Sequence, residues 1–177
     1  MHSRLALNKT AILIRILLFF IAMAIFLGIF FTTAGFSVDA KDADKLVEEF
    51  SQMVMGLDGN GIFVHNATLA SIMFIPGVGA IWGIISASAT GYAFASLLQI
   101  NPDLPFTPIG IFFTPFGILE LIAYSIGISR SILLAKVLIK KSFLKRHIAY
   151  TIIEMCAMII ILYIAGHVEY NAITQLG

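Results

Sequence analysis

Charge is scarce in this chain, and its absence from long stretches decides the class of protein. The 177 residues include 11 Lys and Arg and 10 Asp and Glu, and none of these lies between Gly59 and Pro102. Hydrophobic residues make up 59% of the chain, and the mean hydropathy is +0.97. This composition excludes an ordinary soluble domain and a nucleic-acid-binding protein. The sequence therefore predicts an integral membrane protein with one domain, residues 1–177.

Cysteine and catalytic motifs are also nearly absent. Cys156 is the only cysteine, which excludes a disulfide framework or a cysteine-based metal centre within one chain. The sequence has no glycine-rich phosphate loop, no HExxH and no GxSxG. His65, His167 and Glu169 lie near one predicted membrane surface, where interfacial polar residues are a simpler interpretation than a metal site. We therefore expect no enzyme activity, no cofactor and no bound metal.

The apolar stretches predict an all-α, polytopic transmembrane bundle of about five spans. About 20 helical residues cross a hydrocarbon core of ~30 Å, so the 44 uncharged residues from Gly59 must fold back, with a turn at Pro76–Gly79. Pro108 and Pro115 similarly predict a broken or re-entrant segment. The first apolar run is longer than a signal-peptide core, so we expect it to remain uncleaved. The predicted spans are residues 11–35, 61–75, 78–98, 116–139 and 147–168.

An amphipathic helix is predicted outside the bundle, at about residues 40–56. Apolar residues recur there at helical spacing, while the opposite face carries charges. A solvated linker helix is the alternative. Basic residues flank the start of the first span, at Arg4, Lys9 and Arg15, and gather again at 136–146. This places both regions in the cytoplasm, whereas 37–60, 99–107 and the C-terminus are acidic. We expect a multi-pass protein of the cell membrane with a cytoplasmic N-terminus and an external C-terminus.

A stripe of small residues runs along the helix after the Pro76 turn. Its members recur every four residues and are Gly79, Gly83, Ala87, Gly91 and Ala95. Small stripes let helix backbones approach closely in lipid, where the hydrophobic effect does not drive association. The stripe predicts tight packing, either within the chain or between the copies of a homo-oligomer. A second stripe at Ala123, Gly127 and Ser131 suggests that these two helices pack face to face.

Four residues are the candidate polar groups deep inside the predicted spans: Asn66, Glu120, Arg130 and Glu154. An ionised group at bilayer depth costs about 2–3 kcal/mol or more, so we expect each to have a partner. Counting from the basic loop puts Arg130 and Glu154 at one depth, and Asn66 and Glu120 at another. The predicted pairs are therefore Arg130–Glu154 and Asn66–Glu120. The alternatives are that Arg130 snorkels to the headgroups and that Glu120 caps the helix that begins near Pro115.

Three segments carry a resemblance to a known family. Phe63-Val64-His65-Asn66 is similar to a Phe-x-Asn-Asn pattern, Pro115-Phe116-Gly117-Ile118-Leu119-Glu120 to Pro-His-Gly-x-x-Glu, and Ile128-Ser129-Arg130 to Gly-Leu-Arg. These patterns are those of the stage II sporulation protein M family, and the match covers about residues 60–140. The motif residues are Phe63, Asn66, Pro115, Gly117, Glu120 and Arg130. His65 and Phe116 replace the Asn and His of the family patterns.

The resemblance implies a five-span membrane protein that acts as a scaffold. In spore formers the family member anchors and localises peptidoglycan-degrading partners during engulfment. It therefore implies a non-catalytic scaffold or assembly protein in the lipid bilayer, with membrane or extracytoplasmic proteins as partners. The alternative function is a small-solute or lipid permease, or a permease subunit, that uses Glu120 and Asn66 at broken helices.

Overall fold

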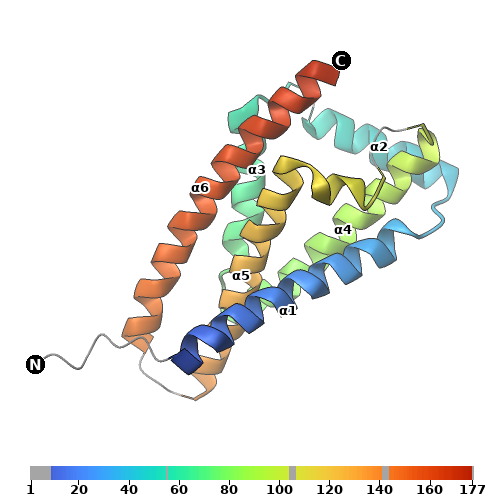
Figure 1. Cartoon of the computed structure of the whole chain (residues 1–177). Coiled ribbons are helices and arrows are strands. Elements are labelled where there is room, and N and C mark those ends of the chain that lie inside the picture. The colour runs from blue at the N-terminus through green and yellow to red at the C-terminus, as the bar shows by residue number, and fades with distance from the viewer. Residues whose placement is uncertain (1–8, 55, 104–106, 141–143, 177) are drawn as a thin grey trace, which may run out of the picture.

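The chain folds into helices throughout the part that the structure describes. The computed structural model describes residues 9–54, 56–103, 107–140 and 144–176, and no strand occurs among them. The elements are α1 (Lys9–Ala34), α2 (Ala40–Val54), α3 (Gly59–Ile72), α4 (Val78–Ile100), the 3₁₀ helix η1 (Gly110–Phe113), α5 (Pro115–Ile139) and α6 (Leu144–Leu176). The predicted all-α bundle is therefore confirmed, and Figure 1 shows its arrangement.

Four helices are long and apolar enough to cross a membrane. These are Lys9–Ala34, Val78–Ile100, Pro115–Ile139 and His147–Gln175. Their outer surfaces carry exposed Ile, Leu and Phe side chains, which suits hydrocarbon rather than water. The predicted span at 61–75 corresponds to α3, which has 14 residues and a length of only about 21 Å. The last helix continues beyond the predicted boundary at 168.

Helix α5 lies at the centre of the bundle and contacts α1, α3, α4 and α6. On one side its Leu121 and Ile128 join a core with Phe26 of α1. On the other side its Ala123 packs with Met158 of α6. Helix α2 crosses the C-terminal half of α4, at the same end of the bundle as the C-terminus (Figure 1). The start of α1, the end of α5 and the start of α6 lie at the opposite end (Figure 1).

The small-residue stripe of α4 packs within the chain. All five of its members are buried. Gly83 faces Ile128 of α5, Gly91 lies against the backbone of α1 at Phe30, and Ala95 joins a cluster with Ala43 of α2. The expectation that the two stripes face each other is wrong, because Gly127 lies against Ala70, Met73 and Phe74. Helix α4 leaves α5 toward its C-terminal end, so only its first turns reach that helix (Figure 1).

The predicted turn between α3 and α4 is present and is held by α5. Gly77 adopts φ +75°, a left-handed conformation that favours glycine. The Ser131 hydroxyl donates to the Ile75 carbonyl at 2.6 Å and accepts from the Ala80 amide at 3.1 Å, while the Gly77 amide donates to the Ser131 carbonyl at 3.3 Å. Irregular backbone at membrane depth requires such internal partners, since lipid offers none.

The break predicted near Pro115 is also present. Helix η1 ends at Phe113, and the Thr114 side chain then accepts from the Gly117 amide at 3.1 Å. Thr114 is therefore the N-cap of α5, with Pro115 in the first turn. The alternative that Glu120 caps this helix is wrong, because Glu120 lies a turn further along and bonds elsewhere.

Replacing Gly91 by Ala should destabilise the protein by about 1–3 kcal/mol. The added Cβ would collide with Thr33 and with the Phe30 carbonyl, which belongs to backbone and cannot rotate away. Gly28→Ala is the matched control, because a Cβ there meets nothing within 4 Å. Thermal unfolding in detergent micelles should show a lower midpoint for G91A only. Equal midpoints for the two variants would contradict the α1–α4 contact.

Ser131→Ala should destabilise the α3–α4 turn by about 1–3 kcal/mol, because the Ala80 amide loses its acceptor and the Ile75 carbonyl its donor. Ser125→Ala is the control. Ser125 is equally buried on the same helix, but its hydroxyl bonds only to Leu121 of its own helix. Hydrogen exchange at residues 73–80 should accelerate in S131A and stay at the wild-type rate in S125A. Unchanged exchange in S131A would show that this hydroxyl does not hold the turn.

Candidate functional site

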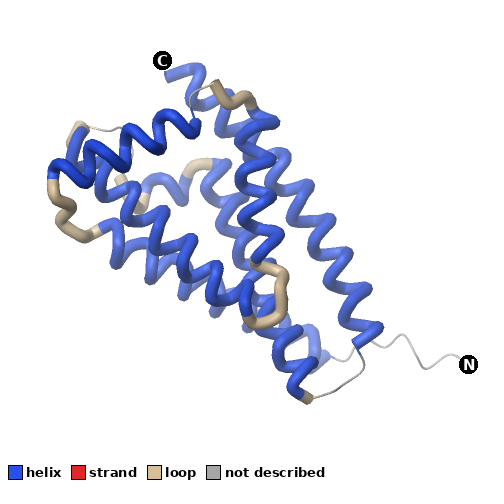
Figure 2. The backbone as a smooth tube through the Cα atoms, turned by 180° about the vertical axis from the view of Figure 1, so that it is seen from behind, coloured by secondary structure: helices blue, strands red, loops and turns tan. Residues whose placement is uncertain are grey.

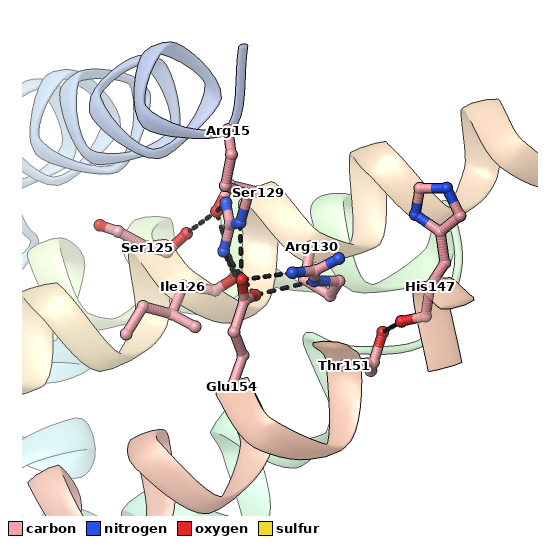
Figure 3. A network of polar contacts seen from close by, with 8 residues as sticks. All are labelled: Arg15, Ser125, Ile126, Ser129, Arg130, His147, Thr151 and Glu154. Carbon is pink, nitrogen blue, oxygen red and sulfur yellow. Dashed lines mark hydrogen bonds and ion pairs between the residues drawn. The ribbon is translucent and has the colours of Figure 1, made fainter. Parts of the chain in front are cut away.

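Two arginines and one glutamate from three helices form a charge cluster inside the bundle (Figure 3). Arg15 of α1 binds Glu154 of α6 through two nitrogens, with Nε to Oε1 at 2.8 Å and Nη2 to Oε2 at 2.6 Å. Arg130 of α5 binds the same carboxylate through Nε to Oε2 at 2.7 Å and through Nη2 to Oε1. Both contacts are bidentate, the strongest arrangement for an arginine and a carboxylate.

Helix α5 completes the binding of Arg15. The Ser129 hydroxyl accepts from Arg15 Nη1 at 2.6 Å, and the Ile126 carbonyl accepts from Nη2 at 3.3 Å. The Ser129 hydroxyl can accept in this way because its own proton goes to the Ser125 carbonyl at 2.5 Å. The cluster therefore holds two positive charges and one negative charge, with Arg130 only 3% exposed.

The predicted pair of Arg130 and Glu154 is present, but the sequence interpretation missed Arg15. The sequence pattern places Arg15 with the basic residues that set the orientation of the first span. The signal that would have identified it is its position: Arg15 follows Lys9 by six residues, with apolar side chains on both sides. An arginine at that depth needs an acceptor, and Glu154 has room for two bidentate partners.

The predicted pair of Asn66 and Glu120 is also present, nearer the other end of the bundle. Asn66 Nδ2 of α3 donates to Glu120 Oε1 of α5 at 2.5 Å. Glu169 of α6 lies beside Glu120, which the sequence interpretation did not foresee, and the buried Glu169 Oε2 has no hydrogen-bond partner among the described residues. Three helices thus meet at this polar group as three meet at the charge cluster.

The remaining motif residues have structural contacts. Phe63 stacks edge-on against Tyr163 of α6, with ring centroids 5.5 Å apart. Gly117 lies where a Cβ would collide with the Ile111 carbonyl of η1. Pro115 begins α5 next to Thr114. These contacts lie where α3, η1 and α6 meet the N-terminal half of α5.

No metal centre emerges around the histidines. His167 packs its ring 4.4 Å from that of Tyr163, and its Nδ1 lies 2.9 Å from the Tyr163 carbonyl. His65 is exposed on α3. Within the described ranges, no three His, Cys, Asp or Glu side chains converge closely enough to hold a metal ion.

Comparison with known proteins adds no relative from which a function could be transferred. No family model, no curated protein and no solved structure matches this chain. A function for this chain is therefore inferred from the geometry of its polar groups and from the surfaces of the bundle.

Glu154→Gln should destabilise the protein by about 3–5 kcal/mol, because two arginines would then lie in the bundle without a counter-charge. Glu49→Gln is the control, since Glu49 is exposed and lies 3.9 Å from Lys45, an arrangement worth at most about 1 kcal/mol. Equilibrium unfolding in mixed micelles should separate the two variants clearly. A Glu154 variant as stable as the control would mean that the cluster does not hold the helices.

Proposed function

We propose that this chain is a non-catalytic membrane scaffold, resembling the stage II sporulation protein M family, that displays an external surface to partner proteins. The observation that carries the proposal is that the polar groups inside the bundle bind one another. Glu154 is bound by Arg15 and Arg130, and Glu120 accepts a hydrogen bond from Asn66. Groups used in this way fix helices relative to one another, which is what a scaffold requires.

The proposed orientation puts the start of α1 and the α5–α6 connection in the cytoplasm. Lys9, Lys136 and Lys140 lie at this end, and acidic α2 lies at the other (Figure 1). In this orientation α1, α4, α5 and α6 cross the membrane. Helix α3 with its turn supplies the fifth, shorter passage, and η1 dips from the outer face. The C-terminus is then external.

Helix α2 is the proposed contact surface for partners. Ala43 of α2 is buried, so this face of the helix lies against the bundle. The opposite face is exposed and carries Asp42, Asp44, Glu48 and Glu49. A rigidly attached, negatively charged helix outside the membrane favours a partner with a basic surface.

Photo-crosslinking from α2 tests this scaffold function. A crosslinking residue at Glu48 should capture a protein partner in native membranes, and the capture should be lost when Asp44 and Glu49 are replaced by Lys. The control places the same group at Ile160, which is exposed on the apolar face of α6. Capture that is equal at both positions, or that survives charge reversal, would contradict the proposal.

A permease or permease subunit is the second candidate. It is favoured by the two interrupted segments, at Gly77 and before Pro115, and by the Asn66–Glu120 bond close to the second one. In liposomes a permease would move solute, and Glu120→Gln would abolish that flux. The scaffold proposal expects no flux from the wild-type protein under any gradient, so measurable transport would reverse the order of the two candidates.

A further inference from the structure

An apolar groove with a basic rim lies on the bundle below the α3–α4 turn. Its volume is about 340 Å³, and its lining residues are Gly77, Ala80, Ile132, Ala135, Lys136, Ile139 and Lys140. Both lysines are exposed. A second, smaller cavity of about 50 Å³ continues along α4 and α5 to α1 and shares Ala80 and Ile132 with the first. The two form one apolar track that begins at the lysines.

The groove exists because α3 is short. Its turn is bonded to α5 at Ser131, and Gly77 lies against Ala135, whereas α5 continues to Ile139. The turn therefore reaches Ala135, which lies about 8 Å before Lys140 along α5. Figure 2 shows the turn as a tan loop above the lower end of the bundle. Apolar side chains cover the surface between the turn and the end of α5. Beside this surface, Val78 is 54% exposed and Ile139 is 82% exposed.

We propose that this groove binds an anionic phospholipid of the bilayer. One acyl chain lies along the track from Ala135 toward Ile128, and the phosphate meets Lys136 and Lys140. The distance along α5 from Ile128 to Lys140 is about 18 Å, close to the thickness of one leaflet of a ~30 Å hydrocarbon core. An amphiphile with one negative end and a long apolar body matches both the chemistry and the length.

Charge complementarity favours this lipid over a second copy of the chain. On this half of the bundle the described residues include one carboxylate, Glu154, and both of its oxygens are bound by Arg15 and Arg130. The other acidic side chains lie on α2, in loops or near the opposite ends of α5 and α6. A parallel copy therefore has no free negative group to offer the two lysines, whereas an anionic headgroup does.

Lipid retention by the full-length protein tests the proposal. Purified protein in mild detergent would receive equal amounts of dioleoyl phosphatidylglycerol and dioleoyl phosphatidylcholine, and native mass spectrometry would count the retained molecules. The wild-type protein should prefer phosphatidylglycerol. Lys136→Gln and Lys140→Gln should each weaken this retention roughly fivefold, since a basic residue at the surface has about this effect. The double variant Lys9→Gln/Lys45→Gln is the control for the double variant Lys136→Gln/Lys140→Gln, because both lose two positive charges.

A second pair of variants tests the apolar part without changing charge. Ala135→Leu should fill the groove and reduce retention of both lipids, whereas Ala89→Leu, on an exposed face of α4, should not. Equal retention of the two lipids by the wild-type protein would overturn the proposal. The same conclusion would follow from wild-type retention in the double lysine variant or in A135L, or from a dimer that A135L dissociates.

Discussion

The bundle depends on one interaction, the binding of the half-buried Glu154 carboxylate by two arginines from different helices. Glu154 joins α6 to α5 through Arg130 and to α1 through Arg15, whose remaining donors reach Ser129 and Ile126 of α5. In lipid, apolar side chains gain little from leaving the solvent, so directional polar contacts decide how helices are placed. The cluster fixes three of the four candidate spans at one depth.

The rest of the fold completes this arrangement by close backbone contact. Gly91 and Ala95 let α4 lie against α1 and α2, and Ser131 supplies the hydrogen bonds that the α3–α4 turn would otherwise lack. Away from the charge cluster, Asn66 joins α3 to Glu120 of α5, and Glu169 of α6 lies beside this pair. The proposed scaffold function and the proposed lipid site both follow from this rigidity, since α2 is held at one end of the bundle and the short α3 leaves the end of α5 uncovered.

The sequence predicted what local chemistry controls and failed where distant helices choose each other. The turn at Gly77, the break before Pro115 and the amphipathic helix, predicted over about 40–56 and found at Ala40–Val54, follow from residues within a few positions. The pairs Arg130–Glu154 and Asn66–Glu120 could be predicted because counting from a hairpin loop gives relative depth. Arg15 and Glu169 were missed, since depth does not say which helices are neighbours. The wrong pairing of the two small-residue stripes has the same cause.

A double-mutant cycle between Arg15 and Glu154 tests the central claim most directly. Unfolding free energies of the wild-type protein, Arg15→Met, Glu154→Gln and the double variant would be measured in the same micelles. If the cluster joins α1 to α6, the two substitutions will couple by at least about 1.5 kcal/mol, because contacting residues in one buried network are not additive. Additivity within about 0.5 kcal/mol would show that Arg15 does not bind this carboxylate and would contradict the account.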